Sequence, residues 1–130
     1  MTANDAPTPA PLTRSLAAMA VGRIALGGAS LAVPSALARV FRINASPELD
    51  YMTRIYGARA IALGVGYLSA GRDRRRWQRL GLLVDGSDTI SGLAHLVRRD
   101  LPRGSALAMA TLTGTYAALG AAHVSRDRAR

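Results

Sequence analysis

The chain has no cysteine among its 130 residues, which excludes disulfides, thiolate catalysis and cysteine-ligated metals. Its two histidines, His95 and His123, form no His-x-x-x-His pair, and no Glu-x-x-His occurs, so we expect no bound metal. No stretch alternates between apolar and polar residues as a strand does, and no serine lies in a nucleophile elbow. We therefore expect a protein that is not an enzyme and that holds no cofactor.

Aromatic residues are scarce, at 5%, although 49% of the chain is hydrophobic. A core would have to be built from Ala, Leu, Val and Gly, and such small side chains suit close helix packing in lipid. The chain is sized for one domain. Together with four apolar segments, this composition predicts an all-α fold, a four-helix transmembrane bundle.

Lysine is absent, and seventeen arginines against eight acidic residues give a formal net charge of +9. Nucleic acid would require the arginines along one face of a soluble fold, whereas anionic lipid headgroups would require them at the ends of apolar segments. Fifteen of the seventeen lie in the tail regions and turns or at helix ends. We therefore expect membrane lipids as partners and no nucleic acid; a soluble basic helical protein that binds nucleic acid is the weaker alternative.

Residues 1–13 carry three prolines at alternate positions and predict a disordered leader. The first apolar segment covers about 15–40, and Pro34 predicts a kink within it. An alternative reading of this segment is a secretory signal that is cleaved after Ala36-Leu37-Ala38. Arg23 inside the apolar stretch, and three further apolar segments, argue against that alternative.

The other apolar segments cover about 48–71, 76–98 and 104–124. Ser46 can cap the second of the four, with Pro47 at its first helical position. The last has no charged residue over twenty positions, enough for one crossing of a bilayer. We expect a transmembrane domain over 14–125, followed by a basic tail at 126–130.

Four crossings would place both termini and the second loop on the same side of a membrane. Nine arginines lie on that side, against six in the other two loops. The excess of arginine predicts cytoplasmic termini, in a multi-pass protein of a bacterial inner membrane.

Two carboxylates, Asp85 and Asp88, lie inside the third segment, on its polar stripe. Ionisable groups at membrane depth need partners. At a rise of about 1.5 Å per residue, Arg59 lies at the depth of Asp88, and Arg23 in the same half as Asp85. The register predicts two buried ion pairs, Arg59 with Asp88 and Arg23 with Asp85.

This cluster could be a proton path, an anion site or a polar ligand pocket, which Tyr56, Thr89 and His95 would complete. It could equally fix which helices meet. Since two arginines and two aspartates sum to zero charge, we favour the structural role.

An arginine-rich loop precedes the third segment, beside a single tryptophan. Such a cluster next to apolar segments predicts an anchor in the lipid headgroups. The predicted anchor consists of Arg72, Arg74, Arg75, Arg76, Trp77 and Arg79.

The last segment presents one face of small residues, and we expect this face to turn inward or to contact a second chain. Its members are Ala108, Thr111, Thr115, Ala118 and Ala122. A bulkier face, which should take the remaining direction, consists of Met109, Leu112, Tyr116 and Leu119.

Several short motifs resemble those of small, loosely DoxX-like four-helix bacterial membrane proteins. The motifs are Arg23-Ile-Ala-Leu-Gly27, Pro34 before Ala-Arg-Val-Phe41, Tyr56-Gly57-Ala58-Arg59, and Asp85 with Asp88 after an arginine-rich loop. The resemblance covers about residues 20–98 and implies the four-helix membrane architecture. DoxX-like proteins have been linked to membrane redox complexes, whereas this chain has neither cysteines nor paired histidines for haem.

The expected function is therefore that of a structural, accessory or assembly subunit that packs against another membrane protein or against a second copy of itself. The alternative is a carrier of a small molecule or of protons that uses the Arg/Asp cluster. A ligand-sized cavity beside Arg59 and Asp88 would favour the carrier.

Overall fold

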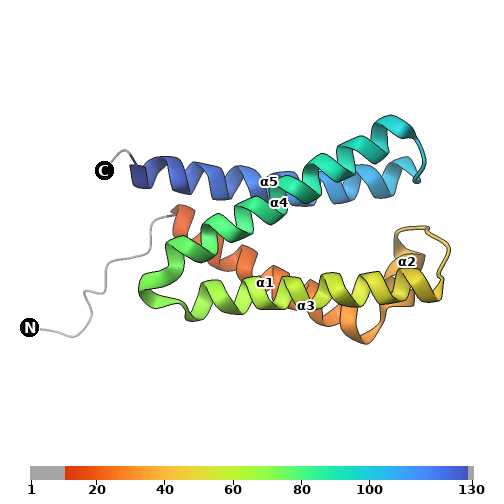
Figure 1. Cartoon of the computed structure of the whole chain (residues 1–130), viewed down its shortest axis with the longest axis horizontal. Coiled ribbons are helices and arrows are strands. Elements are labelled where there is room, and N and C mark those ends of the chain that lie inside the picture. Colours follow the sequence, from red (N-terminus) through yellow and green to blue (C-terminus); the bar gives the residue numbers. More distant parts are fainter. Residues whose placement is uncertain (1–10, 129–130) are drawn as a thin grey trace, which may run out of the picture.

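The computed structural model describes residues 11–128, which are helical throughout apart from short connections, and no strand occurs among them. Six helical elements follow one another along these described residues (Figure 1). They are α1 (Pro11–Ala32), α2 (Pro34–Val40), α3 (Pro47–Ser69), the short 3₁₀ helix η1 (Gly71–Asp73), α4 (Arg74–Arg98) and α5 (Arg103–Arg128).

The first apolar segment is two helices rather than one kinked helix, which corrects the prediction for 15–40. Val33 separates them with non-helical dihedrals (φ −137°, ψ 54°), and Pro34 begins α2. A residue before proline avoids the α conformation, because the proline ring crowds its backbone. The first helix also begins at Pro11, so residues 11–13 of the predicted leader are helical, while residues 1–10 lie outside the described part.

The other three segments have nearly the predicted bounds. Ser46 caps α3, since its hydroxyl accepts a hydrogen bond from the backbone N–H of Leu49 at 3.1 Å. Most of the predicted arginine-rich loop is instead the first turns of α4. At the other end, α5 runs through Arg128, so described residues of the predicted basic tail are helical, and residues 129–130 lie outside the described part.

The long helices form two hairpins. In the first, α1 packs along α3, and in the second, α4 packs along α5; contacts between the hairpins are fewer. Figure 1 shows α4 crossing the first hairpin near η1 and diverging from α3 beyond it. We call the end that holds η1, the start of α1 and the end of α5 the closed end, and the end that holds α2, loop 41–46 and the α4–α5 turn the open end.

Glycines let α1 and α3 approach each other closely. A Cβ atom built on Gly27 would lie 2.6 Å from the carbonyl oxygen of Gly57, and one built on Gly64 would lie 2.6 Å from that of Ala20. Since no real Cβ tolerates such a distance to backbone, these glycines set the spacing of the first hairpin.

Among the described helices, α1 is the single one that is both long and apolar enough overall to cross a membrane. It lies near the N-terminus, where signal sequences pass the same test. The helical architecture is thus established, whereas four membrane crossings remain a prediction.

Candidate functional site

Arg23 of α1 and Asp85 of α4 form an ion pair between the two hairpins. The Nη2 group of Arg23 donates a hydrogen bond to Oδ2 of Asp85. Both residues are buried, Asp85 to a relative exposure of 2%. The guanidinium also lies 4.9 Å from the ring centre of Tyr116 on α5, within the range of a cation–π contact. This is one of the two contacts predicted from the register.

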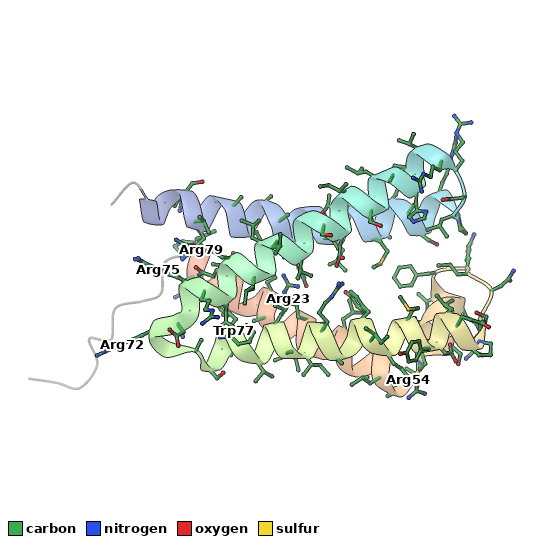
Figure 2. All side chains as sticks on the ribbon, viewed as in Figure 1. Arg23, Arg54, Arg72, Arg75, Trp77 and Arg79 are labelled. Atoms are coloured by element: carbon green, nitrogen blue, oxygen red, sulfur yellow. The ribbon has the colours of Figure 1, made fainter. Side chains whose placement is uncertain are left out.

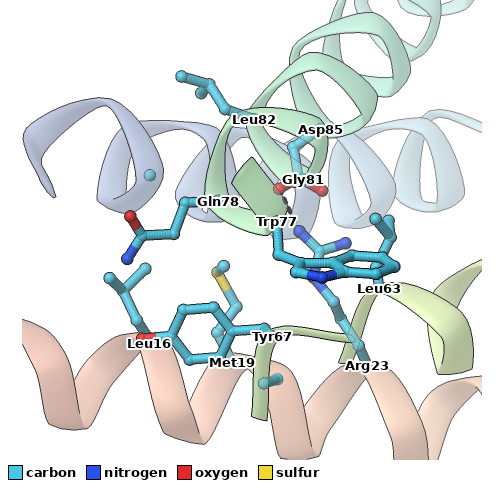
Figure 3. Close-up of a pocket in the computed structure, with 12 residues that line it drawn as sticks. Leu16, Met19, Arg23, Leu63, Tyr67, Trp77, Gln78, Gly81, Leu82 and Asp85 are labelled. Carbon is cyan, nitrogen blue, oxygen red and sulfur yellow. Dashed lines mark hydrogen bonds and ion pairs between the residues drawn. The ribbon is translucent and has the colours of Figure 1, made fainter. Parts of the chain in front are cut away.

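Large side chains surround this pair at the closed end (Figure 3). Leu16, Ala20 and Tyr67 form the buried core there, with Trp77 packed against them. A Cβ atom on Gly66 would collide with the indole of Trp77, so the ring lies directly on the α3 backbone. The cavity left between these groups measures about 20 Å³, which is room for one water.

Arg59 of α3 and Asp88 of α4 form the second predicted contact, with Nη2 and Oδ2 2.7 Å apart. This pair is not buried within the chain, since the two side chains are 43% and 26% exposed. The expectation of burial is therefore corrected for this pair. Asp88 lies about one turn beyond Asp85 along α4.

The cavity beside Arg59 and Asp88 measures about 10 Å³, at the lower limit for a single water. Tyr56 lines it, and its ring centre lies 5.5 Å from the Arg59 guanidinium. No ligand larger than water fits there. The charged side chains of the Arg/Asp cluster are thus paired with one another.

Thr89 and His95 do not line this cavity, so the structure does not assemble the predicted polar pocket. Thr89 instead joins α4 to α5: its Oγ1 lies 2.6 Å from the carbonyl oxygen of Asp85 and 3.0 Å from Oγ1 of Thr113. His95 lies at the open end.

There, Nδ1 of His95 lies 2.8 Å from Oδ1 of Asp100, in the α4–α5 turn. This hydrogen bond lowers the pKa of Asp100. Within residues 11–128, no group of three or more histidines and carboxylates is placed to hold a metal ion.

The predicted headgroup anchor divides into two parts. Trp77 lies between the hairpins, whereas Arg72, Arg75 and Arg79 project from the closed end (Figure 2). The guanidinium of Arg74 lies 5.4 Å from the ring centre of Tyr67. All five arginines of the anchor are exposed. The arginines therefore lie on the surface of the closed end, while the indole belongs to the packed core.

Sequence reasoning missed three contributors to the site. Gln78 is buried beside Asp85 at the closed end, Thr113 is buried against Thr89, and Tyr116 stacks on Arg23. Gln78 lies on the same polar stripe of α4 as Asp85, and this shared face was the sequence signal that could have predicted its burial. Nothing in the sequence indicated which face of α5 would meet α4.

The chain matches no protein-family model, no curated protein and no solved structure. The resemblance to DoxX-like proteins stays a prediction.

Proposed function

We propose that this chain is a small integral membrane protein whose four long helices cross the bilayer, and that it serves as an accessory or assembly subunit rather than as an enzyme. The single observation that carries the proposal is the reversed polarity of α4. This helix buries Gln78 and Asp85 and exposes Leu83 (69%), Ile90 (70%) and Val97 (81%). In water this arrangement exposes apolar surface at a cost, whereas in lipid it places each group in its preferred surroundings.

Exposed large apolar residues on the other long helices support the same interpretation. Val21 lies on α1, Ile55 and Val65 lie on α3, and Leu107 lies on α5; all four are about half exposed. The mean hydropathy of α3 and α4 is lowered by Arg59, Asp85 and Asp88, and each of these charges is paired, Asp85 with Arg23 and Arg59 with Asp88. Composition therefore understates how apolar their outer faces are.

The structural role of the ion pairs is favoured over the carrier alternative. Arg23–Asp85 links α1 to α4, and Arg59–Asp88 links α3 to α4, so both pairs join one hairpin to the other. The cavities beside them hold one water each at most. A carrier of small molecules needs a larger site at this position.

A partner protein is supported by α5. All five members of its small-residue face are exposed, while the bulkier residues Met109, Leu112, Tyr116 and Leu119 turn towards the rest of the chain. This exposure favours the second of the two predicted positions, contact with another chain, because lipid leaves small residues poorly packed.

Reporter fusions test the topology. A reporter after Arg130 and one in the α4–α5 turn, at Leu101, should report opposite sides of the membrane, with Arg130 cytoplasmic. The nine arginines on the terminal side set this orientation. Reporters on the same side would contradict four crossings, and release of the chain from membranes by carbonate would favour the soluble, nucleic-acid-binding alternative.

The variant Ala118→Leu tests the partner face. Overpacking typically costs about 1–3 kcal/mol, so the associated fraction should fall about tenfold or more on a native gel in mild detergent. Ser91→Leu, on the exposed outer face of α4, is the matched control and should leave association unchanged. If Ala118→Leu leaves both yield and mobility unchanged, the small face meets only lipid and the accessory role loses its main support.

A further inference from the structure

The open end contains an apolar cavity of about 260 Å³. It lies between α1, α2, loop 41–46 and α3, and α5 closes one side with Met109. Its walls are mostly apolar, and the apolar side chains that line it include Leu26, Leu37, Phe41, Leu49, Met52 and Met109. An apolar cavity of about 150 Å³ is enough to take up benzene. This cavity is therefore ligand-sized, unlike the voids beside the ion pairs.

A second space of about 450 Å³ adjoins this cavity at Phe41, which lines both. The second space lies between the end of α2 and the start of α5 and is lined by Arg42 and Ser105 among others. The hydroxyl of Ser105 donates a hydrogen bond to the carbonyl oxygen of Phe41, which ties the two hairpins at this point. An elongated molecule could thus lie with one part in the apolar cavity and the other part at Arg42.

The second space carries positive charge at Arg42. This residue lines the space, is exposed, and is held in the left-handed region (φ 54°) after the end of α2. The carboxylates of Glu48 and Asp50, on the first turn of α3, line neither cavity. A guanidinium binds a carboxylate with two parallel hydrogen bonds, which suits an anionic head at this place.

We propose that the open end binds one long-chain fatty acid, with its carboxylate at Arg42 in the second space and the far part of its chain in the apolar cavity. By the benzene measure the apolar cavity takes roughly ten carbons, which suits the end of one chain better than the two chains of a phospholipid. The inference does not depend on four membrane crossings, since a fatty acid reaches the cavity from a bilayer or from water.

The test uses the full chain in a non-ionic detergent and palmitate that carries a photoreactive diazirine. Crosslinks, mapped by peptide mass spectrometry, should lie at cavity residues such as Leu37 and Met109. Oleate should suppress the crosslink at a concentration about tenfold lower than oleyl alcohol does, since the alcohol has no charge for Arg42. Equal competition by the two, or crosslinks spread over the outer faces of the helices, would overturn the proposal.

Two variants test separately where the hydrocarbon chain of the fatty acid and where its carboxylate bind. Thr53→Phe places an aromatic ring in the cavity wall and should lower the crosslink yield about tenfold, whereas Ile55→Phe, on the exposed side of the same helix, is the matched control and should leave it unchanged. Arg42→Asn keeps a residue that tolerates the left-handed backbone and should make oleate compete no better than oleyl alcohol. If oleate still competes better than oleyl alcohol in Arg42→Asn, the carboxylate does not bind at Arg42, and this result holds even if Thr53→Phe fails to fold. If phosphatidylglycerol competes at the same concentration as oleate, the ligand is a bilayer lipid and the proposal of a free fatty acid is overturned.

Discussion

The two ends of the bundle join the hairpins in opposite ways. At the closed end, Trp77 lies on the backbone of Gly66 and the buried Arg23–Asp85 pair crosses from one hairpin to the other, with about 20 Å³ left unfilled. At the open end, the bond from Ser105 to Phe41 spans a gap that leaves about 260 Å³ on one side of Phe41. The two hairpins are thus packed against each other most tightly at the closed end, and stability should be concentrated there.

The largest expected effect is that of Asp85→Ala at the closed end. It leaves the Arg23 guanidinium buried without its partner, which costs about 3–5 kcal/mol and should remove most of the folded protein. The yield of monodisperse protein in detergent measures this loss. Asp88→Ala should cost less, because its partner Arg59 is half exposed.

A double variant sharpens the comparison of the two pairs. Arg23→Met combined with Asp85→Leu removes both buried charges and should recover much of the yield. If the double variant folds but lacks a cellular activity that the unchanged protein has, the Arg23–Asp85 pair has a functional role and the structural interpretation is wrong.

A medium effect is expected from two glycine variants, one at each end. Gly64→Ala would place a Cβ atom 2.6 Å from the carbonyl oxygen of Ala20, so α1 and α3 must separate, at a typical overpacking cost of about 1–3 kcal/mol. Gly104→Ala meets nothing within 4 Å and should be neutral or slightly stabilising. Melting temperatures in detergent measure both, and equal temperatures would contradict a closed end that is more tightly packed.

The smallest effect is expected at the open end, from the pH dependence of the His95–Asp100 contact. Because folding lowers the pKa of Asp100, the contact stabilises the protein above the ordinary aspartate pKa of 3.8, and this stabilisation is lost as the pH falls through the lowered value. Asp100→Asn should therefore melt slightly below the unchanged protein near neutral pH, and the difference should vanish in acid. A difference that persists below the lowered pKa would show that the asparagine acts through packing.

Much of the fold followed from local signals in the sequence. Ser46 with Pro47 marks the start of α3, and apolar runs with few charged residues inside them mark the lengths of the long helices. The two ion pairs were predictable because helical rise fixes depth, so that Arg23 and Asp85 could be matched before any packing was known.

The rest depends on packing between distant residues. The indole of Trp77 faces inward because Gly66, on another helix, leaves room for it, and no local pattern records that pairing. The exposure of Arg59 depends on the angle at which α4 leaves α3, which the lengths of the helices do not determine. For the same reason the cavity at the open end was not expected, since it arises from the break at Val33 together with that divergence.

The placement of the four paired charges also bears on the order in which the protein is made. Synthesis begins at the N-terminus, so the first hairpin is complete while α4 is still to come. That hairpin carries Arg23 and Arg59 within α1 and α3 but no carboxylate between Tyr51 and Ser69 or within α1, and both missing partners arrive together on α4. Until α4 is made, Arg23 and Arg59 in the first half of the chain therefore lack their carboxylate partners. A separately expressed second half, which supplies Asp85 and Asp88, should restore the folding of the first half.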